Sequence, residues 1–179
     1  SVMKGKRIEI IPDACAGCGI CFAECPRKAI GMDNTGSGIE NLLRNDSVHQ
    51  NQNMDPVFVA FCCSRSAARA HDQAIQLEHR IPAHFKMVRV PCAGTVSTSL
   101  ILEAFSQGAA GVMVLTCHEG NCHSETGNRH ARRRVDYLSD HLDSIGFGGN
   151  RLTVKTLAAN METEFVQIAE DFVRTLQET

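Results

Sequence analysis

The residues of this 179-residue chain that could do chemistry are its nine cysteines. They fall into two groups, one from Cys15 to Cys25 and one from Cys62 to Cys122. Nothing at the start of the sequence resembles a signal peptide, so we expect a cytoplasmic protein. In a reducing cytosol, grouped cysteines serve as metal ligands or redox thiols rather than as disulfides, and the odd count also argues against full pairing. The sequence thus predicts two metal or thiol sites.

The elements that must position the second group are four short apolar runs typical of buried strands, each followed by a stretch with helical periodicity. This alternation predicts a parallel sheet covered by helices, because parallel strands need crossover connections. We therefore expect an α/β fold with a four-stranded parallel sheet in the order βαβαβαβα. The expected strands are Val57–Phe61, Met87–Pro91, Ala110–Leu115 and Leu152–Leu157.

The last three expected helices each place apolar residues at steps of three and four, which gives each helix one buried face. Ser97, Thr98 or Ser99 can cap the helix that ends near Gly108, and the next helix stops near Gly146. The expected buried positions are Ile101, Ala104 and Phe105 in the first helix; Ala131, Val135, Leu138, Leu142 and Ile145 in the second; and Phe165, Ile168, Ala169, Phe172 and Leu176 in the third.

Cysteines follow three of the expected strands, and the carboxyl ends of parallel strands lie on one edge of the sheet. Cys63, Cys92 and Cys117 should therefore converge there, and Cys122, on the next loop, can complete a set of four. We call these four the rim cysteines. Sulfur coordination serves zinc and iron–sulfur clusters alike, so the pattern leaves the metal open. A catalytic thiol at a strand end is a further alternative.

The first group is the run Cys15-x-x-Cys18-x-x-Cys21-x-x-x-Cys25-Pro26, whose four cysteines we call the N-terminal cysteines. This is the ligand run of bacterial ferredoxins, and it predicts a [4Fe–4S] cluster. Zinc, the alternative, prefers two separated Cys-x-x-Cys pairs. In two-cluster ferredoxins the fourth cysteine binds the other cluster. With a single run here, either Cys25 closes its own cluster or a partner chain completes the module.

A series of motifs follows in order from about Val57 onward: Phe61-Cys62-Cys63, Val90-Pro91-Cys92-Ala93-Gly94, Cys117-His118-x-Gly120-x-Cys122-His123 and Gly127-Asn128. With these motifs the sequence resembles the delta subunit of methyl-viologen-reducing hydrogenase. That iron–sulfur protein links a hydrogenase, or in some organisms a formate dehydrogenase, to the heterodisulfide reductase flavoprotein. Many members have a further cysteine where this chain has Ser66.

The resemblance implies a [2Fe–2S] cluster held by the rim cysteines Cys63, Cys92, Cys117 and Cys122, with Cys62 as an alternative to Cys63. It also implies an electron-transfer protein that is not catalytic alone. The expected partners are a heterodisulfide reductase A-like flavoprotein and a hydrogenase or formate dehydrogenase. The alternative functions are a zinc-binding structural or interaction module and a thiol-dependent redox enzyme.

The expected organisation is a ferredoxin-like module at residues 1–35, a polar linker at 36–55 and the α/β domain at 56–179. A net charge of −2, a single Tyr and no Trp give no reason to expect nucleic-acid binding. No apolar run approaches the ~18 residues that a membrane span requires. We therefore expect neither nucleic acid nor membrane insertion.

Two further features have a plain and a functional interpretation. His118 and His123 each follow a cysteine, and we expect them to lie beside the sulfurs rather than to bind metal. The basic stretch Arg129–Arg134 is interpreted as a solvated helix face, with docking to an acidic partner as the alternative.

Overall fold

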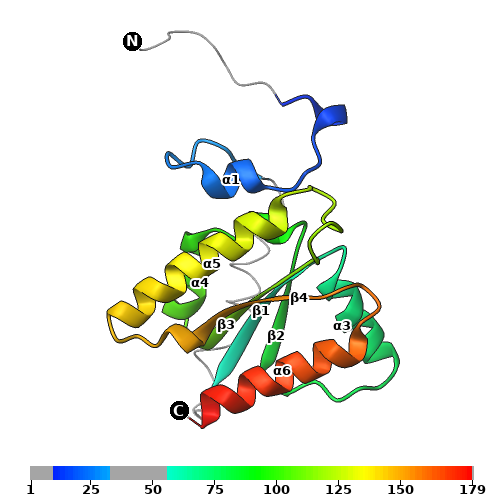
Figure 1. Cartoon of the computed structure of the whole chain (residues 1–179), viewed down its shortest axis with the longest axis vertical. Helices are drawn as coiled ribbons and strands as arrows, with labels where there is room; N and C mark the ends of the chain where they lie inside the picture. Colours follow the sequence, from blue (N-terminus) through cyan, green and yellow to red (C-terminus); the bar gives the residue numbers. More distant parts are fainter. Residues whose placement is uncertain (1–9, 33–55, 179) are drawn as a thin grey trace.

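A four-stranded parallel sheet lies at the centre of residues 56–178 (Figure 1). This computed structural model describes residues 10–32 and 56–178, so the expected linker at 36–55 lies outside the described residues. The strand order is β2-β1-β3-β4, and every pair of neighbouring strands is parallel. The strands are β1 (Val57–Cys63), β2 (Phe85–Val90), β3 (Ala109–Thr116) and β4 (Leu152–Thr156).

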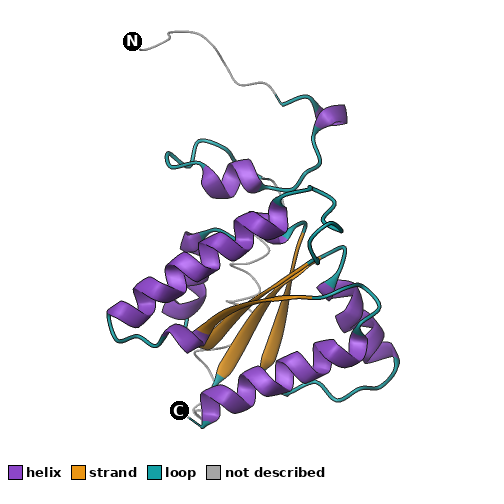
Figure 2. Ribbon diagram, in the orientation of Figure 1, coloured by secondary structure: helices purple, strands orange, loops and turns teal. Residues whose placement is uncertain are grey.

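Helices cover both faces of the sheet, as Figure 2 shows. One face is covered by α3 (Ala67–Gln76) and α6 (Glu162–Gln177), and the other by α4 (Thr98–Ser106) and α5 (Gly127–Ser144). A short 3₁₀ helix, η3 (Gly149–Arg151), precedes β4. The predicted α/β fold with a four-stranded parallel sheet is therefore confirmed.

The two central strands are buried on both sides, as expected for strands of a parallel sheet with both faces covered. Their side chains alternate between two hydrophobic cores, because successive residues of a strand point to opposite faces. The core beneath α4 and α5 receives Val59, Phe61 and Cys63 from β1, and the core beneath α3 and α6 receives Phe58, Ala60 and Cys62.

The helices follow the sequence pattern, with Phe105, Ile168 and Leu176 partly buried and one predicted core residue exposed. Ser97 caps α4, since its side chain accepts a hydrogen bond from the Leu100 amide at 3.2 Å. The predicted apolar face of α5 is buried as far as Leu142. Ile145 is the wrong prediction: it lies one residue beyond the helix, next to Gly146 with its φ of 76°, and its side chain is 75% exposed.

The first described residues form the N-terminal module, residues 10–32, with a 3₁₀ turn η1 (Pro12–Ala14) and a short helix α1 (Ile20–Glu24). Residues 8 and 9, at the start of the run Ile8–Ile11, lie outside the described part. Among the helices of the described residues, none combines the length and the apolar composition of a membrane span.

The close approach of α6 to the sheet gives a first prediction. A Cβ at Gly111 of β3 would lie 2.5 Å from Leu176 Cδ1 and 2.8 Å from Phe172 Cζ. Gly111→Ala should therefore lower the free energy of unfolding by about 1–3 kcal/mol, measured by chemical denaturation. Gly31→Ala is the matched control, since nothing would lie within 4 Å of a Cβ at that position. Equal stability of the two variants would contradict this packing.

Candidate functional site

The fold brings the rim cysteines together at the carboxyl edge of the sheet. Cys63 is the last residue of β1, Cys117 follows β3, Cys92 precedes the 3₁₀ helix η2 (Ala93–Thr95), and Cys122 lies in the loop before α5. All four side chains are buried, and none forms a disulfide. They line one cavity of about 130 Å³. Three strand ends and one loop thus deliver four free thiols to one place.

The rim cysteines lie as two pairs. The sulfurs of Cys63 and Cys117 are 3.6 Å apart. The hydroxyl of Ser124 lies 3.3 Å from the sulfurs of both Cys92 and Cys122 and so connects the second pair. Within the described residues, no group of three or more His, Cys, Asp or Glu side chains is placed so that it could hold one metal ion.

Helix α5 begins directly against the second pair, and this contact requires a glycine. A Cβ at Gly127 would lie 2.4 Å from the Cys92 sulfur and 2.5 Å from the Ser124 hydroxyl. The first turn of a helix carries partial positive charge, which favours negative charge nearby. The start of α5 therefore supports thiolates at this edge of the sheet. Asn128 holds the preceding loop, since its side-chain amide donates to the carbonyls of Cys117 and His118 at 3.2 and 3.1 Å.

The surroundings favour thiolate on one member of each pair. The Cys117 thiol lowers the pKa of Cys63 to about 5, and the same hydrogen bond raises the pKa of Cys117. Burial raises the pKa of Cys92. Burial also opposes ionisation of Cys122, but hydrogen bonds from Ser124 and nearby backbone amides outweigh it and lower the pKa. A cation in the cavity would favour thiolate on all four.

Cys62, the predicted alternative to Cys63, lies on the other face of the sheet. Its side chain is fully buried in the core beneath α3 and α6, and its sulfur contacts the Ala60 carbonyl at 3.6 Å. Burial raises the pKa of this thiol. The alternation of β1 therefore directs only Cys63 to the rim.

The four N-terminal cysteines have different surroundings in the structure. Cys15 and Cys21 are exposed, and Cys18 lines the rim cavity together with the rim cysteines. Cys25 lines a separate cavity of about 620 Å³ bounded by α1, α4 and α5. Its sulfur accepts a hydrogen bond from the Ala29 amide at 3.3 Å, which lowers the pKa of Cys25.

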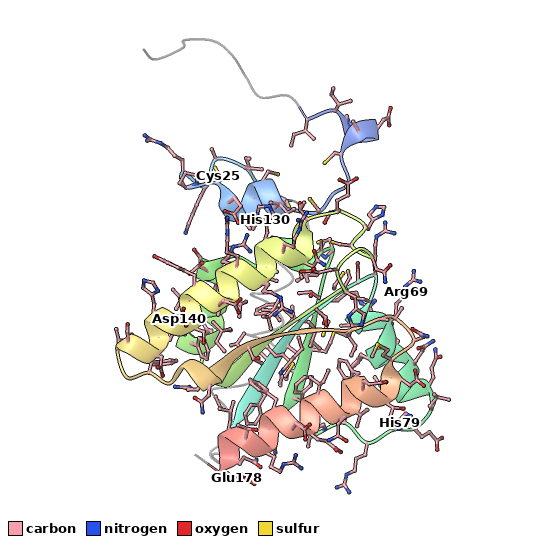
Figure 3. All side chains as sticks on the ribbon, in the orientation of Figure 1. Cys25, Arg69, His79, His130, Asp140 and Glu178 are labelled. Atoms are coloured by element: carbon pink, nitrogen blue, oxygen red, sulfur yellow. The ribbon has the colours of Figure 1, made fainter. Side chains whose placement is uncertain are left out.

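The N-terminal module docks against η2 and the first half of α5 (Figure 1). The Arg134 guanidinium forms an ion pair with Glu24, and His130 Nδ1 lies 3.5 Å from the same carboxylate. Figure 3 shows Cys25 and His130 on the two sides of this junction. One residue of the predicted basic stretch therefore binds an acidic group of its own chain, whereas Arg129, Arg132 and Arg133 are exposed.

Sequence reasoning missed the residues that support the two sites. Thr95, buried at the junction, donates from its hydroxyl to the Cys18 carbonyl at 2.8 Å, and nothing in the sequence distinguishes it from other small polar loop residues. Ser124 carries no such signal either. His123 lines the rim cavity, whereas His118 lies with its Nε2 3.5 Å from the Met161 sulfur.

Comparison with known proteins identifies the α/β domain. A family model described as the delta subunit of methyl-viologen-reducing hydrogenase matches residues 58–179. The chain belongs to this delta subunit family. A second model, a 4Fe-4S binding domain, matches residues 8–31, which include all four N-terminal cysteines.

Two hydrogenase proteins are similar to the part of the chain that the delta subunit family covers. The iron–sulfur subunit of a hydrogenase from Methanocaldococcus jannaschii is 36% identical over 124 residues, covering 69% of this chain and 92% of the relative. A corresponding iron–sulfur protein from Methanococcus voltae is 37% identical over 118 residues, covering 66% and 81%. Both matches span about two thirds of this chain.

A longer match joins the N-terminal module to the delta subunit domain. The A polypeptide of the ferredoxin:CoB-CoM heterodisulfide reductase from Methanosarcina mazei is 31% identical over 197 aligned residues. This alignment covers 93% of the present chain but only 25% of that polypeptide. The combination of both parts thus occurs within a much larger relative.

The Glu24–Arg134 ion pair gives a pH-dependent prediction. The hydrogen bond from Arg134 holds the pKa of Glu24 below its usual value of 4.5. A lowered pKa means that the ion pair stabilises docking fully above about pH 4.5 and is lost as the pH falls through the folded-state value. At neutral pH the amides of residues 20–24 should exchange faster in Glu24→Gln than in wild type. On acidification the protection of these amides in wild type should fall to that in Glu24→Gln, so the difference between the two proteins should disappear.

The control is Asp171→Asn, which removes an exposed ion pair with Arg174 on α6, far along the chain from the junction. This variant should leave the exchange of residues 20–24 unchanged at every pH. Equal exchange of α1 in wild type and Glu24→Gln at neutral pH would contradict a stabilising role for the ion pair.

Proposed function

We propose that this chain is an iron–sulfur electron-transfer protein with two centres, one at each set of cysteines. Membership in the delta subunit family and the similarity to a hydrogenase iron–sulfur subunit and to the heterodisulfide reductase A polypeptide support an iron–sulfur electron-transfer role. The observation that carries the proposal is the convergence of four buried, unpaired thiols on one cavity. Four thiols that line one cavity form the kind of sulfur ligand set that an iron–sulfur centre requires.

The rim cysteines are the proposed ligands of a [2Fe–2S] cluster. Each iron of such a cluster takes two protein ligands, so the cluster needs two pairs of cysteines and not three ligands around one ion. The pair Cys63 and Cys117 and the pair Cys92 and Cys122 meet this requirement. When bound, the cluster would accept and release one electron at a time.

The surrounding residues of the chain have two roles at this centre. Burial of the four thiols keeps water away. The Ser124 hydroxyl and the Gly94 amide, 3.4 Å from the Cys92 sulfur, can donate hydrogen bonds to the sulfurs, and such donors adjust the reduction potential. The Ser66 hydroxyl is buried without a hydrogen-bond partner among the described residues, which leaves it able to donate to a sulfur of the first pair.

The N-terminal cysteines Cys15, Cys18, Cys21 and Cys25 are the proposed ligands of a [4Fe–4S] cluster, which the match to a 4Fe-4S binding domain supports. In this arrangement Cys25 is the fourth ligand of its own cluster. The alternative is that a partner chain supplies the fourth ligand. The division into a module at 1–35, a linker at 36–55 and a domain at 56–179 stays a prediction.

The proposed partners follow from the relatives. We propose that the chain relays single electrons between a hydrogenase or formate dehydrogenase and a heterodisulfide reductase A-like flavoprotein in the cytoplasm. The relatives named as hydrogenase proteins and as a heterodisulfide reductase polypeptide support both ends of this relay. The exposed arginines of α5 offer a basic surface to an acidic partner.

A thiol-dependent enzyme is less well supported. The lowered pKa of Cys63 would suit a nucleophile, but its side chain is only 2% exposed. Reactive cysteines lie in partly exposed positions that a substrate can reach. Burial therefore favours a ligand role for Cys63 over a catalytic one.

The proposed function is tested by iron and zinc content, visible absorbance and low-temperature EPR of anaerobically purified protein, before and after dithionite. We expect about six irons per chain and the signals of both cluster types. Zinc without iron would overturn the proposal. About four irons without a [2Fe–2S] signal would overturn the assignment of the rim cysteines.

The ligands are tested one by one. Cys117→Ser should abolish the [2Fe–2S] signal, remove about two irons per chain and leave the [4Fe–4S] signal in place. Cys92→Ser should behave in the same way. Cys62→Ala is the matched control, since Cys62 lies on the opposite face of the sheet, and it should keep all iron. Loss of the [2Fe–2S] signal in Cys62→Ala would contradict the choice of Cys63 as the ligand from β1.

A further inference from the structure

Thr95 connects the backbones of the two sets of cysteines. It lies in η2, three residues after Cys92, and its side chain is fully buried. Its hydroxyl donates to the carbonyl of Cys18 at 2.8 Å, and its backbone amide donates to the carbonyl of Cys92 at 2.9 Å. One residue therefore forms hydrogen bonds to an N-terminal cysteine and to a rim cysteine.

Two glycines allow the close approach that this connection requires. A Cβ at Gly19 would lie 2.4 Å from the Thr95 hydroxyl oxygen, and a Cβ at Gly94 would lie 2.7 Å from Ile20 Cγ1. Real Cβ atoms do not come this close to their neighbours, so any other residue would separate α1 from η2. The junction is thus packed for contact on both of its sides.

A second set of contacts holds the module from the side of α5. The Arg134 side chain is 10% exposed, and it donates to the carbonyls of Gly94 and Val96, which flank Thr95, as well as to Glu24. The same guanidinium therefore fixes η2 and binds the end of α1. Together with Thr95, it places Cys18 at the cavity of the rim cysteines.

We infer that Thr95 is the positioning residue that couples the two centres for electron transfer. This inference rests on the proposed function. Thr95 fixes the distance between the two cysteine sets and supplies a hydrogen-bonded path from Cys18 to Cys92. One electron passes along it, so one centre is oxidised by one electron as the other is reduced by one, and no covalent bond or proton is exchanged. The rate of such a transfer falls steeply with distance, so a fixed junction is a condition for the relay.

The test compares Thr95→Val with Thr95→Ser in the full chain carrying both centres. Valine keeps the volume, the β-branch and the backbone amide but lacks the hydroxyl, whereas serine keeps the hydroxyl. The Cys18 carbonyl loses its hydrogen bond only in Thr95→Val. Hydrogen exchange of residues 20–24 should then rise roughly five- to tenfold, and should change little in Thr95→Ser.

Two spectroscopic readouts separate coupling from simple stability. In fully reduced wild type, the magnetic interaction between the two centres should broaden their EPR signals, and Thr95→Val should reduce this broadening. After a one-electron reductive pulse, redistribution of the electron between the centres should slow in Thr95→Val. Thr95→Ser should keep the broadening and the redistribution rate of wild type. The signals of both centres should persist in both variants.

The outcomes distinguish this inference from the proposed function. If Thr95→Val holds both centres with the broadening and redistribution rate of wild type, the inference is overturned and the proposed function stands. If wild type shows no iron–sulfur signals, the proposed function fails and the inference with it. If Thr95→Val does not hold both centres, Glu24→Gln decides: reduced broadening supports coupling through the docked junction, and unchanged broadening overturns it.

Discussion

Burial of four thiols at one edge of a parallel sheet is the constraint on which the rest of this structure depends. Thiolates are unfavourable in an apolar core unless a cation or hydrogen-bond donors compensate for the lost hydration. The groups next to the rim cysteines include such donors. Gly127 brings the start of α5 against Cys92, and Ser124 places one hydroxyl between two sulfurs. The sheet brings the rim cysteines together, and the loops provide the small and polar residues that stabilise the buried thiols.

The same constraint explains how much the sequence could predict. The rim cysteines were found because a parallel sheet collects its carboxyl ends at one edge, which links distant cysteines without any knowledge of contacts. The alternation of side chains along β1 also separates Cys63 from Cys62. Only the odd-numbered residues from Val59 to Cys63 face α4 and α5. Ile145 failed because a helical period predicts a face but not the residue at which the helix ends.

The junction between the two parts could not be predicted in this way. Thr95 and Arg134 act through single long-range contacts, and no local period encodes such contacts. The interpretation of the basic stretch on α5 as a solvated face agrees with the exposure of Arg129, Arg132 and Arg133, but Arg134 is partly buried and binds Glu24. Likewise, the spacing of the N-terminal cysteines indicates a cluster type, but it does not indicate that Cys18 would lie at the rim and Cys25 in another cavity.

The separation of the junction's two sides along the chain has a consequence for biosynthesis. Glu24 and Arg134 are 110 residues apart. At about 5–20 residues per second, the ribosome makes Arg134 roughly 5–20 s after Glu24. During that interval the part of the docking surface that belongs to α5 does not exist, and Glu24 has no Arg134 to pair with. The N-terminal module therefore reaches its docked position only after α5 has been made.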